Sequence, residues 1–294
     1  MQCKNPYYEP NLGILCPCRQ CLPCRINRRQ DWATRAILEA TEYKDSSFLT
    51  LTYNDDNIPL NGTLVPKHLQ LFWKKLRNKQ RVVINNKKMT IPGLKFRYFA
   101  CGEYGEKSFR PHYHAIVYGI DATTLNFFAS NHWDKGYVYC VPATVETMRY
   151  VAGYVTKKLA VRRDYLASGV EPEFIRTSLG IGKTAIEKLR NIALVQNNAL
   201  DVISTFRIGG QNVRVPNYIK KKLREIVFDD EYLSKLKDAR VYQMQTDVTE
   251  RIFKWYEVKE NRKELAIKSH LQEYKQHFLN IERKDSIWNT RSKV

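Results

Sequence analysis

The sequence predicts an α+β domain built on a mainly antiparallel sheet, followed by a helical C-terminal extension. Short runs that alternate apolar and polar residues, as half-buried strands do, recur between residues 47 and 141. Single helices with a one-sided apolar stripe interrupt these runs, and neighbouring strands are joined by connections of hairpin length, which favours antiparallel pairing. From residue 218 onward the chain is rich in lysine and helical in character, with scattered aromatic residues.

The first elements in chain order are a helix, a strand, a second helix and a hairpin. Residues 24 to 43 are rich in helix formers and carry an apolar stripe, and the arginines around that stripe suit a solvated face as well as DNA contact. Residues 47 to 53, Ser-Phe-Leu-Thr-Leu-Thr-Tyr, predict a half-buried strand. Pro66 begins a predicted helix that runs to about Asn78. Residues 81 to 91 predict a hairpin. The core positions of the second helix are Leu69, Phe72, Trp73 and Leu76.

Two strands, a helix, a strand and a further helix follow. Lys95 to Cys101 predicts a strand that ends in the loop Gly-Glu-Tyr-Gly. A short polar connection leads to a strand over residues 110 to 119, so we expect the two to form an antiparallel pair. We also expect a helix over residues 122 to 130, a strand over 136 to 141 and a helix over 144 to 159.

Beyond residue 159 the pattern is weaker. Thr177 to Thr184, T-S-L-G-I-G-K-T, lacks the first glycine of a phosphate-binding loop and follows no buried strand that is evident from the sequence, so we read it as a turn. Residues 206 to 215 predict a hairpin around Gly209-Gly210. The predicted organisation is a Cys-rich element and helix (1–45), an endonuclease-like core (46–165), a mixed extension (166–230) and a basic helical tail (231–294).

The charge of the chain indicates a polyanionic partner. Forty-nine Lys and Arg against thirty Asp and Glu give a formal charge of +19, and such a surplus attracts nucleic acid or an anionic membrane. No apolar run approaches the length of a membrane span and the N-terminus has no signal-peptide core, so we expect a cytosolic protein.

Five of the seven cysteines lie at the N-terminus: Cys3, Cys16, Cys18, Cys21 and Cys24. Disulfides are disfavoured in the cytosol, so metal binding is the better explanation for such a cluster. Four or five thiolates could close a tetrahedral structural zinc site. An iron–sulfur cluster and reduced, metal-free thiols are the alternatives left open. Cys101 and Cys140 lie in predicted strands and read as small core residues.

A pair of histidines predicts a metal centre for chemistry. His112 and His114 flank Tyr113 on a predicted strand, where side chains at i and i+2 point to the same face, so both imidazoles can reach one ion. Such an ion needs a further, hard oxygen ligand. Glu103, at the end of the neighbouring strand, is the first candidate and Glu106 the reserve. This ligand set suits Mg²⁺ or Mn²⁺ acting as a Lewis acid on phosphate.

A pair of tyrosines predicts covalent catalysis. Tyr150 and Tyr154 are spaced i, i+4 on a predicted helix, one turn apart on one face. A tyrosine can attack phosphorus and hold the product covalently. About one phenol in a thousand is ionised at neutral pH, so a nearby cation would help. Lys157, about one turn further on, is a candidate electrostatic helper.

Taken together, these motifs resemble those of the rolling-circle replication initiators of the HUH endonuclease superfamily, and most closely those of microviruses of the gokushovirus type. The resemblance is carried by three motifs in order: Phe-Leu-Thr-Leu-Thr-Tyr at 48 to 53, Gly-Glu-Tyr-Gly with Arg-Pro-His-Tyr-His, and Tyr-Val-Ala-Gly-Tyr-Val-Thr-Lys. The cysteine cluster followed by Arg28, Trp32, Arg35 and Glu39 is also similar to that group. The motif-level resemblance covers roughly residues 1 to 160.

This resemblance implies an RRM-like palm and a site-specific nickase and strand-transferase that acts on single-stranded DNA at the replication origin. One tyrosine becomes linked to the 5′-phosphate, the freed 3′-hydroxyl primes the host polymerase, and the second tyrosine acts when the strand is closed into a circle, without ATP. His112, His114 and Glu103 are then the metal ligands, and Tyr150 and Tyr154 alternate as nucleophiles. The resemblance also implies the cytoplasm of a bacterial host as location, and host helicase and polymerase as partners.

Two other functions are compatible with the same residues. A plasmid replication protein or a single-strand transposase of the same superfamily would use the same chemistry, although paired tyrosines favour replication initiation. A non-catalytic, zinc-stabilised nucleic-acid-binding protein would keep the histidines and tyrosines as core residues.

Overall fold

The computed structural model divides into two compact units. One comprises Arg28–Ile192 with Ile203–Lys220, and the other comprises Met1–Asn27, Ala193–Val202 and Lys221–Val294. The structure describes residues 3–9, 11, 14–84, 87–105, 108–157, 169–195, 201–208, 210–257, 276–284 and 286. Each unit is described by itself below.

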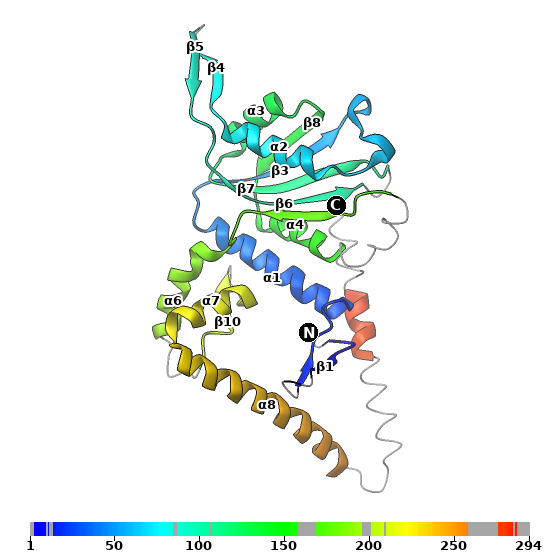
Figure 1. Cartoon of the computed structure of the whole chain (residues 1–294), viewed down its shortest axis with the longest axis vertical. Coiled ribbons are helices and arrows are strands. Elements are labelled where there is room, and N and C mark those ends of the chain that lie inside the picture. Colours follow the sequence, from blue (N-terminus) through cyan, green and yellow to red (C-terminus); the bar gives the residue numbers. More distant parts are fainter. Residues whose placement is uncertain are drawn as a thin grey trace. The chain divides into compact units, whose positions relative to one another are not determined.

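The first unit is built on a five-stranded sheet in the order β8-β3-β7-β6-β9, in which every neighbouring pair is antiparallel (Figure 1). The strands are β3 (Ser46–Tyr53), β6 (Arg97–Tyr104), β7 (Pro111–Tyr118), β8 (Gly136–Pro142) and β9 (Phe174–Thr177). With the helices that flank this sheet and the helical C-terminal region, the predicted α+β class is confirmed.

Helices cover both faces of the sheet. Figure 1 shows α2 (Pro66–Arg77) and α3 (Ala122–His132) on one side, and α4 (Val145–Lys157) with α1 (Leu22–Ala40) on the other. Proline at the first position of α2 and the Asp121 carboxylate, which accepts from the Thr124 amide at 2.9 Å, start the first two of these helices. The four predicted core residues of α2 are all buried.

The strand alternation divides the core into two clusters, one on each face. Leu49, Leu51, Tyr53, Tyr113 and Val117 belong to the cluster that also holds the buried side chains of α2 and α3. Phe48, Phe99, Cys101, Ile116 and Tyr118 belong to the cluster that holds those of α1 and α4. Residues one place apart on a strand therefore enter different layers.

The remaining elements are hairpins and helices. The predicted hairpins are present as β4 (Gln80–Ile84) with β5 (Lys87–Ile91), and as β10 (Thr205–Ile208) with β11 (Gln211–Arg214); Asn85, Asn86 and Gly209 lie outside the described residues. The helices α6 (Ile186–Val195), α7 (Asn217–Val227) and α8 (Asp230–Glu257) follow, and residues 276–284 are also helical. At the N-terminus β1 (Tyr7–Glu9) pairs with β2 (Ile14–Cys16). Short 3-10 turns occur at Asp55–Asn57, Leu60–Gly62 and Lys183–Ala185.

The predicted end of strand β6 at Cys101 is wrong, and the error concerns the site. Strand β6 continues to Tyr104, whose hydroxyl accepts a hydrogen bond from the Leu64 amide at 2.9 Å and donates one to the Glu171 carbonyl at 2.6 Å. Gly102 is required within this extension, because a Cβ there would lie 2.7 Å from the Phe174 ring. Glu103 therefore belongs to the strand and not to a loop.

The rejected phosphate-binding segment forms a turn, as predicted, and helix α1 holds it. Gly180 and Gly182 have φ of +68° and +81°. The fully buried Glu39 carboxylate accepts from the Gly182 amide at 2.7 Å and pairs with Arg97 at 2.5 Å, while Arg35 Nε donates to the Ile181 carbonyl at 2.9 Å. Arg35 and Glu39 thus have a structural role in the fold.

Within the part of the chain that the structure describes, no helix combines the length and the apolar character needed to cross a bilayer.

Candidate active site

Strand register brings the predicted metal ligands onto one face of the sheet. In one row across the sheet, Thr52 on β3 lies opposite His112 on β7, which lies opposite Glu103 on β6. In the next row on the same face, Thr50 lies opposite His114. Directly opposed residues of antiparallel strands point to the same side, so these side chains share the face covered in part by α4.

The two threonines fix the histidine rings. Thr50 Oγ1 is hydrogen-bonded to His114 Nδ1 at 2.9 Å, and Thr52 Oγ1 to His112 Nδ1 at 3.0 Å. Because Nδ1 of each ring is engaged, Nε2 is the atom that faces the site, which is the arrangement seen in metal-binding histidines. The sequence analysis missed both threonines, although the Leu-Thr-Leu-Thr alternation that places them is part of the predicted strand.

A buried carboxylate completes this group. His114 Nε2 and Glu103 Oε1 lie 2.6 Å apart, and both side chains are buried. The rings of His112 and His114 have centroids 6.2 Å apart. Burial, and then the neighbouring His114, lower the pKa of His112, which favours the neutral imidazole that a metal requires.

Helix α4 brings both tyrosines onto the same group. The Tyr150 hydroxyl donates to Glu103 Oε1 at 3.3 Å. Its ring meets the His114 ring edge-on with centroids 5.3 Å apart, and the Tyr154 ring stacks on His114 at 6.0 Å. Tyr150 is half-buried and Tyr154 is buried. The phenols and the metal-type ligands therefore lie in one cluster, which is the juxtaposition that the predicted chemistry needs.

The environment of the phenols keeps them protonated in the absence of a cation. Burial, and then the negative charge of Glu103, raise the pKa of Tyr150 well above its usual value. The same two causes raise the pKa of Tyr154 further. Positive charge near Glu103 would oppose the second cause.

Two predicted residues cannot be placed in this cluster. Lys157 is the last residue of α4, but its side chain lies outside the described residues, as does the reserve ligand Glu106.

The donor set fits a divalent ion, although the three groups are not drawn tightly together. Among the residues that the structure describes, only the cysteines form a group whose ligand atoms all lie within 4.8 Å of one another. The present His114–Glu103 hydrogen bond takes up the Nε2 lone-pair direction and one carboxylate oxygen. Two imidazoles and a carboxylate on one sheet face are nonetheless a mixed N/O set suited to Mn²⁺ or Mg²⁺.

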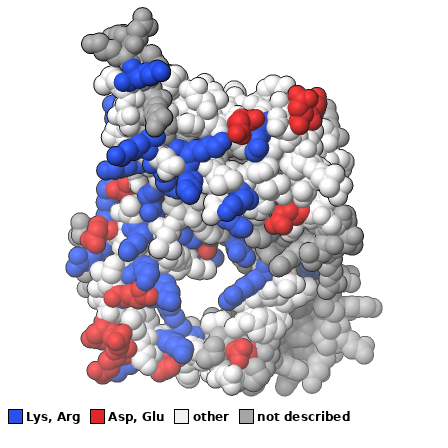
Figure 2. Space-filling view, turned by 45° about the horizontal axis from the view of Figure 1, so that its top comes forward, with Lys and Arg blue, Asp and Glu red and all other residues white. Residues whose placement is uncertain are grey.

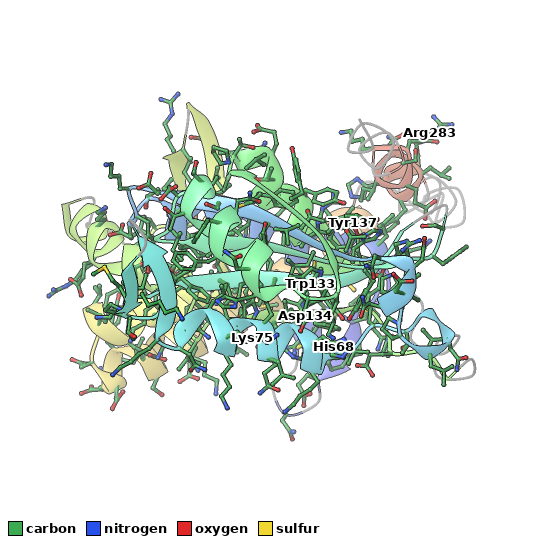
Figure 3. All side chains as sticks on the ribbon, turned by 90° about the horizontal axis from the view of Figure 1, so that it is seen from above. His68, Lys75, Trp133, Asp134, Tyr137 and Arg283 are labelled. Atoms are coloured by element: carbon green, nitrogen blue, oxygen red, sulfur yellow. The ribbon has the colours of Figure 1, made fainter. Side chains whose placement is uncertain are left out.

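Two exposed tyrosines extend the site across the sheet, and the sequence analysis missed them. Tyr137 and Tyr139 on β8 lie opposite Thr52 and Thr50, so they share the face of the two histidines. They are 67 % and 59 % exposed, which is unusual for aromatic side chains on a sheet. Tyr137 comes shortly after Trp133 and Asp134, and Asp134 pairs with Lys75 of α2 at 3.1 Å (Figure 3). Helix α4 contacts β6, β7 and β9, leaving this side of the face open.

The surface charge suits a polyanion. Figure 2 shows Lys and Arg side chains spread widely over the face drawn, with Asp and Glu in smaller separate groups. The formal charge of +19 agrees with this distribution.

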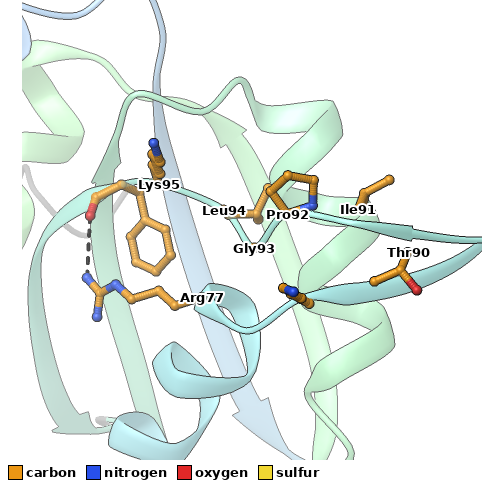
Figure 4. Close-up of a pocket in the computed structure, with 9 residues that line it drawn as sticks. Arg77, Thr90, Ile91, Pro92, Gly93, Leu94 and Lys95 are labelled. Atoms are coloured by element: carbon orange, nitrogen blue, oxygen red, sulfur yellow. Dashed lines mark hydrogen bonds between the residues drawn. The ribbon is translucent and has the colours of Figure 1, made fainter.

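A groove of about 900 Å³ is a separate feature (Figure 4). Its walls come from the end of α2, from β5 and from the segment before β6, and include Arg77, Lys79 and Lys95. The Arg77 guanidinium lies 4.3 Å from the Phe96 ring centroid and donates to the Phe96 carbonyl at 3.4 Å. The groove adjoins the start of β6, whereas Glu103 lies near the end of that strand, so it is not part of the candidate active site.

The cysteines are placed in the second unit. Cys3, Cys18, Cys21 and Cys24 come together, and Cys16 is outside the group of four. Cys101 is fully buried and Cys140 half-buried in the first unit.

Comparisons with known proteins agree with this arrangement. Residues 46–159, which include every residue of the candidate active site, match a family model of replication-associated proteins of the ORF2 type. The replication-associated protein ORF2 of Spiroplasma virus 4 is 32 % identical over 257 residues, covering 80 % of this chain and 75 % of that protein. Protein VP4 of Bdellovibrio phage phiMH2K is 31 % identical over 50 % of each chain. Protein ORF4 of Chlamydia phage 1 is 29 % identical over 75 % of this chain and 58 % of its own length. Both are also named replication-associated proteins.

No solved structure matches the chain. The length and identity of the first of these matches are sufficient to place the chain, and they confirm the resemblance drawn from the motifs. The protein belongs to the replication-associated proteins of phages, of the microvirus rolling-circle type.

Proposed function

We propose that this protein nicks and rejoins single-stranded DNA at the phage replication origin through a covalent tyrosine–DNA intermediate. The observation that carries the proposal is the contact of both α4 tyrosines with the His114–Glu103 pair, with the Tyr150 hydroxyl 3.3 Å from the carboxylate. Buried phenols in contact with a histidine–carboxylate pair on a basic protein suit attack on a phosphodiester.

In the proposed reaction the Tyr150 or Tyr154 oxygen forms a bond to phosphorus as the bond to the 3′ oxygen breaks. The phenolic proton leaves the tyrosine, and a proton is taken up by the departing oxygen, which becomes a free 3′-hydroxyl. The 5′-phosphate stays on the tyrosine. Reversal by that hydroxyl, or attack by the 3′-hydroxyl of another strand end, restores a phosphodiester without ATP. Tyr150 is the more accessible phenol and already directs its hydroxyl at Glu103.

His112, His114 and Glu103 would hold Mg²⁺ or Mn²⁺. Such an ion supplies positive charge beside the reacting phosphate and the developing phenolate. The threonine hydroxyls keep the two imidazoles oriented for this role, and the lowered pKa keeps His112 neutral. Lys157 is proposed as an electrostatic helper on its position in α4 alone.

Single-stranded DNA is proposed to cross the open half of the same face. Tyr137 and Tyr139 would stack bases two strands away from the histidines, while Lys and Arg side chains hold phosphates. Replacing both by alanine should weaken binding of a single-stranded oligonucleotide by about 1–3 kcal/mol for each base stacked. Phenylalanine at both positions should retain binding, and Tyr242→Ala, an exposed tyrosine of α8, is the matched control.

The setting proposed for this activity is the cytoplasm of the bacterial host, where host helicase and polymerase would extend the freed 3′-hydroxyl.

The test uses single-stranded oligonucleotides that tile the circular genome encoding the protein, labelled on either side of each junction, with Mn²⁺. A protein–DNA adduct that survives a denaturing gel and carries only the 5′-phosphate side is expected. Tyr150→Phe and Tyr154→Phe should each retain an adduct under some condition, and the double variant should form none. Tyr242→Phe controls for tyrosine loss in general.

An adduct that persists in the double variant would overturn the assignment of the nucleophiles. No adduct with any oligonucleotide, together with retained DNA binding, would favour a non-catalytic DNA-binding protein. A plasmid-type initiator or a transposase would form the same adduct, so the distinction from these rests on the phage relatives.

A further inference from the structure

The second unit carries a cluster of four cysteines with the geometry of a metal site. Their Sγ atoms all lie within 4.8 Å of one another, and those of Cys3 and Cys21 are 3.7 Å apart. Four sulfurs bound tetrahedrally at a zinc–sulfur distance of about 2.3 Å would lie about 3.8 Å from one another. The observed separations need only small side-chain movements to reach that arrangement. All four residues are free cysteines.

We propose that Cys3, Cys18, Cys21 and Cys24 bind one structural Zn²⁺ ion, and that this ion organises the docking surface for the helix at residues 276–284. Four thiolates leave no open coordination position, which is the mark of a structural zinc site and not of a catalytic one. Soft thiolate donors select zinc over the hard cations proposed for the histidine site.

The backbone around the cluster is arranged for thiolates. The Lys4 amide donates to Cys21 Sγ at 3.3 Å, the Cys18 amide to Cys3 Sγ at 3.2 Å, and the Cys21 amide to Cys18 Sγ at 3.3 Å. Arg19, between two of the ligands, has φ of +61°, a left-handed conformation that this tight C-x-x-C turn imposes. Cys24 lies in the first turn of α1, where the helix dipole favours negative charge.

Protonation equilibria in the cluster are consistent with these contacts. Burial opposes ionisation of Cys18, but hydrogen bonds from the Cys21 and Gln20 amides outweigh it and bring the pKa of Cys18 to about 6. Burial and the neighbouring thiols raise the pKa of Cys24 to about 12. A bound divalent cation would deprotonate all four thiols.

The segment has little else to hold it in place. Apart from Cys3 and Cys24, the buried apolar residues in this part of the described chain are few, and Ile26 is the main one. In small segments of this kind, metal binding contributes much of the folding free energy. The β1–β2 hairpin, with Tyr7 opposite Cys16, returns the chain toward the other three ligands.

The C-terminal helix packs on the structure that the cluster organises. Phe278 and Ile281 are buried against Ile26 and Leu22, which begin α1 directly after Cys21. Lys4, next to Cys3, pairs with Glu282 at 3.5 Å and lies 5.7 Å from the Phe278 ring centroid. Residues on either side of the ligands thus form the seat of this helix, so loss of the ion should release it.

The proposal can be tested on the full-length protein without any DNA substrate, so its outcome is independent of the proposed nicking activity. Protein purified under reducing conditions without chelators should contain one zinc per chain by elemental analysis. Alkylation followed by mass spectrometry should find Cys3, Cys18, Cys21 and Cys24 protected and Cys16 modified. Chelation should expose the four cysteines and accelerate proteolysis within residues 276–284, and added Zn²⁺ should reverse both effects.

Variants separate ligands from a bystander. Cys18→Ser or Cys21→Ser should lower the zinc content at least tenfold, and Cys16→Ser, the matched control, should leave it at one per chain. Retention of zinc by the ligand variants, or its loss from Cys16→Ser to the same extent, would overturn the ligand set. Wild-type protein that neither contains zinc nor takes it up in the reduced state would overturn the proposal as a whole.

Discussion

The two faces of the central sheet are made by the same strands but are stabilised in different ways. On β3, Leu49, Leu51 and Tyr53 enter the core under α2 and α3, and the intervening Thr50 and Thr52 face the candidate active site. On β7, Tyr113 and Ala115 alternate with the two histidines in the same manner. A single residue step separates a position that fills volume from one that orients a reactive group.

The closed face also contains polar atoms, and they show the contrast most clearly. The Tyr53 and Tyr113 hydroxyls are 2.6 Å apart, and the Tyr113 hydroxyl bonds to both the amide and the carbonyl of Val65 at 3.0 Å. These groups satisfy one another within the protein, as buried polar groups in a core do. On the other face the threonine, histidine and carboxylate groups form a chain that ends at two phenols, Tyr150 and Tyr154, aimed at a substrate position. We expect substitutions on the two faces to separate activity from stability.

The largest expected effect is on the active-site face, at Glu103. Glu103→Gln keeps the shape but removes the charge that pairs with His114 and contacts Tyr150. If the carboxylate holds a Lewis-acidic ion, several kcal/mol of transition-state stabilisation are lost, so the nicking rate should fall on the order of a thousandfold. Glu171→Gln, at an exposed carboxylate, is the matched control. A rate within tenfold of wild type in a gel-based nicking assay would exclude Glu103 as a ligand.

The next effect is expected on the closed face, one residue away from a site threonine. Leu51 is 1 % exposed, and Leu51→Ala should lower the free energy of unfolding by about 2–5 kcal/mol through lost burial and a residual cavity. The change should be visible in urea denaturation, and the rate constant of the folded protein should be near wild type. Leu60→Ala, at a leucine that is 86 % exposed, should change stability by less than about 0.5 kcal/mol. A nicking defect in Leu51→Ala larger than its unfolded fraction would show that the two faces are coupled.

A smaller effect is expected from the hydroxyls that orient the imidazoles. Thr50→Val retains the side-chain shape but removes the hydrogen bond to His114 Nδ1. Loss of such an orienting contact typically weakens metal affinity or activity about 10–100-fold, so the Mn²⁺ concentration for half-maximal nicking should rise by that factor. Unfolding free energy should change by only about 1 kcal/mol. Thr90→Val, at an exposed residue of β5, should leave the Mn²⁺ dependence unchanged; an unchanged dependence in Thr50→Val itself would argue against metal binding by His114.

The sequence was sufficient to predict the parts of the sheet in which local pattern and tertiary position agree. The alternation in β3 and the i, i+2 histidines of β7 already indicate one shared face, and the i, i+4 tyrosines need only a helix. The end of β6 was predicted wrongly because it depends on contacts distant in sequence: Tyr104 bonds to Leu64 and Glu171, and Phe174 covers Gly102.

Strand β9 illustrates the same limit. Its four residues, Phe-Ile-Arg-Thr, carry no long alternation, and their extended state comes from pairing with β6 from Phe99 to Gly102. Tyr137 and Tyr139 could be assigned to a strand, but their position beside the histidines follows only from the order β8-β3-β7, which local pattern does not contain. The gathering of Cys3 with the other three cysteines likewise requires the β1–β2 hairpin.

The smallest effect is a pH dependence expected from the closed face, where His68 Nδ1 lies 2.8 Å from the Tyr53 hydroxyl. Burial, and then the positive charge of Lys135, lower the pKa of His68, with Asp134 opposing them. The unfolded chain then takes up a proton at higher pH than the folded protein, so this group's contribution to stability is complete above about pH 6.5 and is lost as the pH falls through the folded-state pKa. His68→Gln should therefore flatten the acid side of the curve of unfolding free energy against pH, measured by urea denaturation. His277→Gln, at an exposed histidine, should leave that curve unchanged, and a His68→Gln curve as steep as wild type would assign the acid sensitivity to the histidines of the other face.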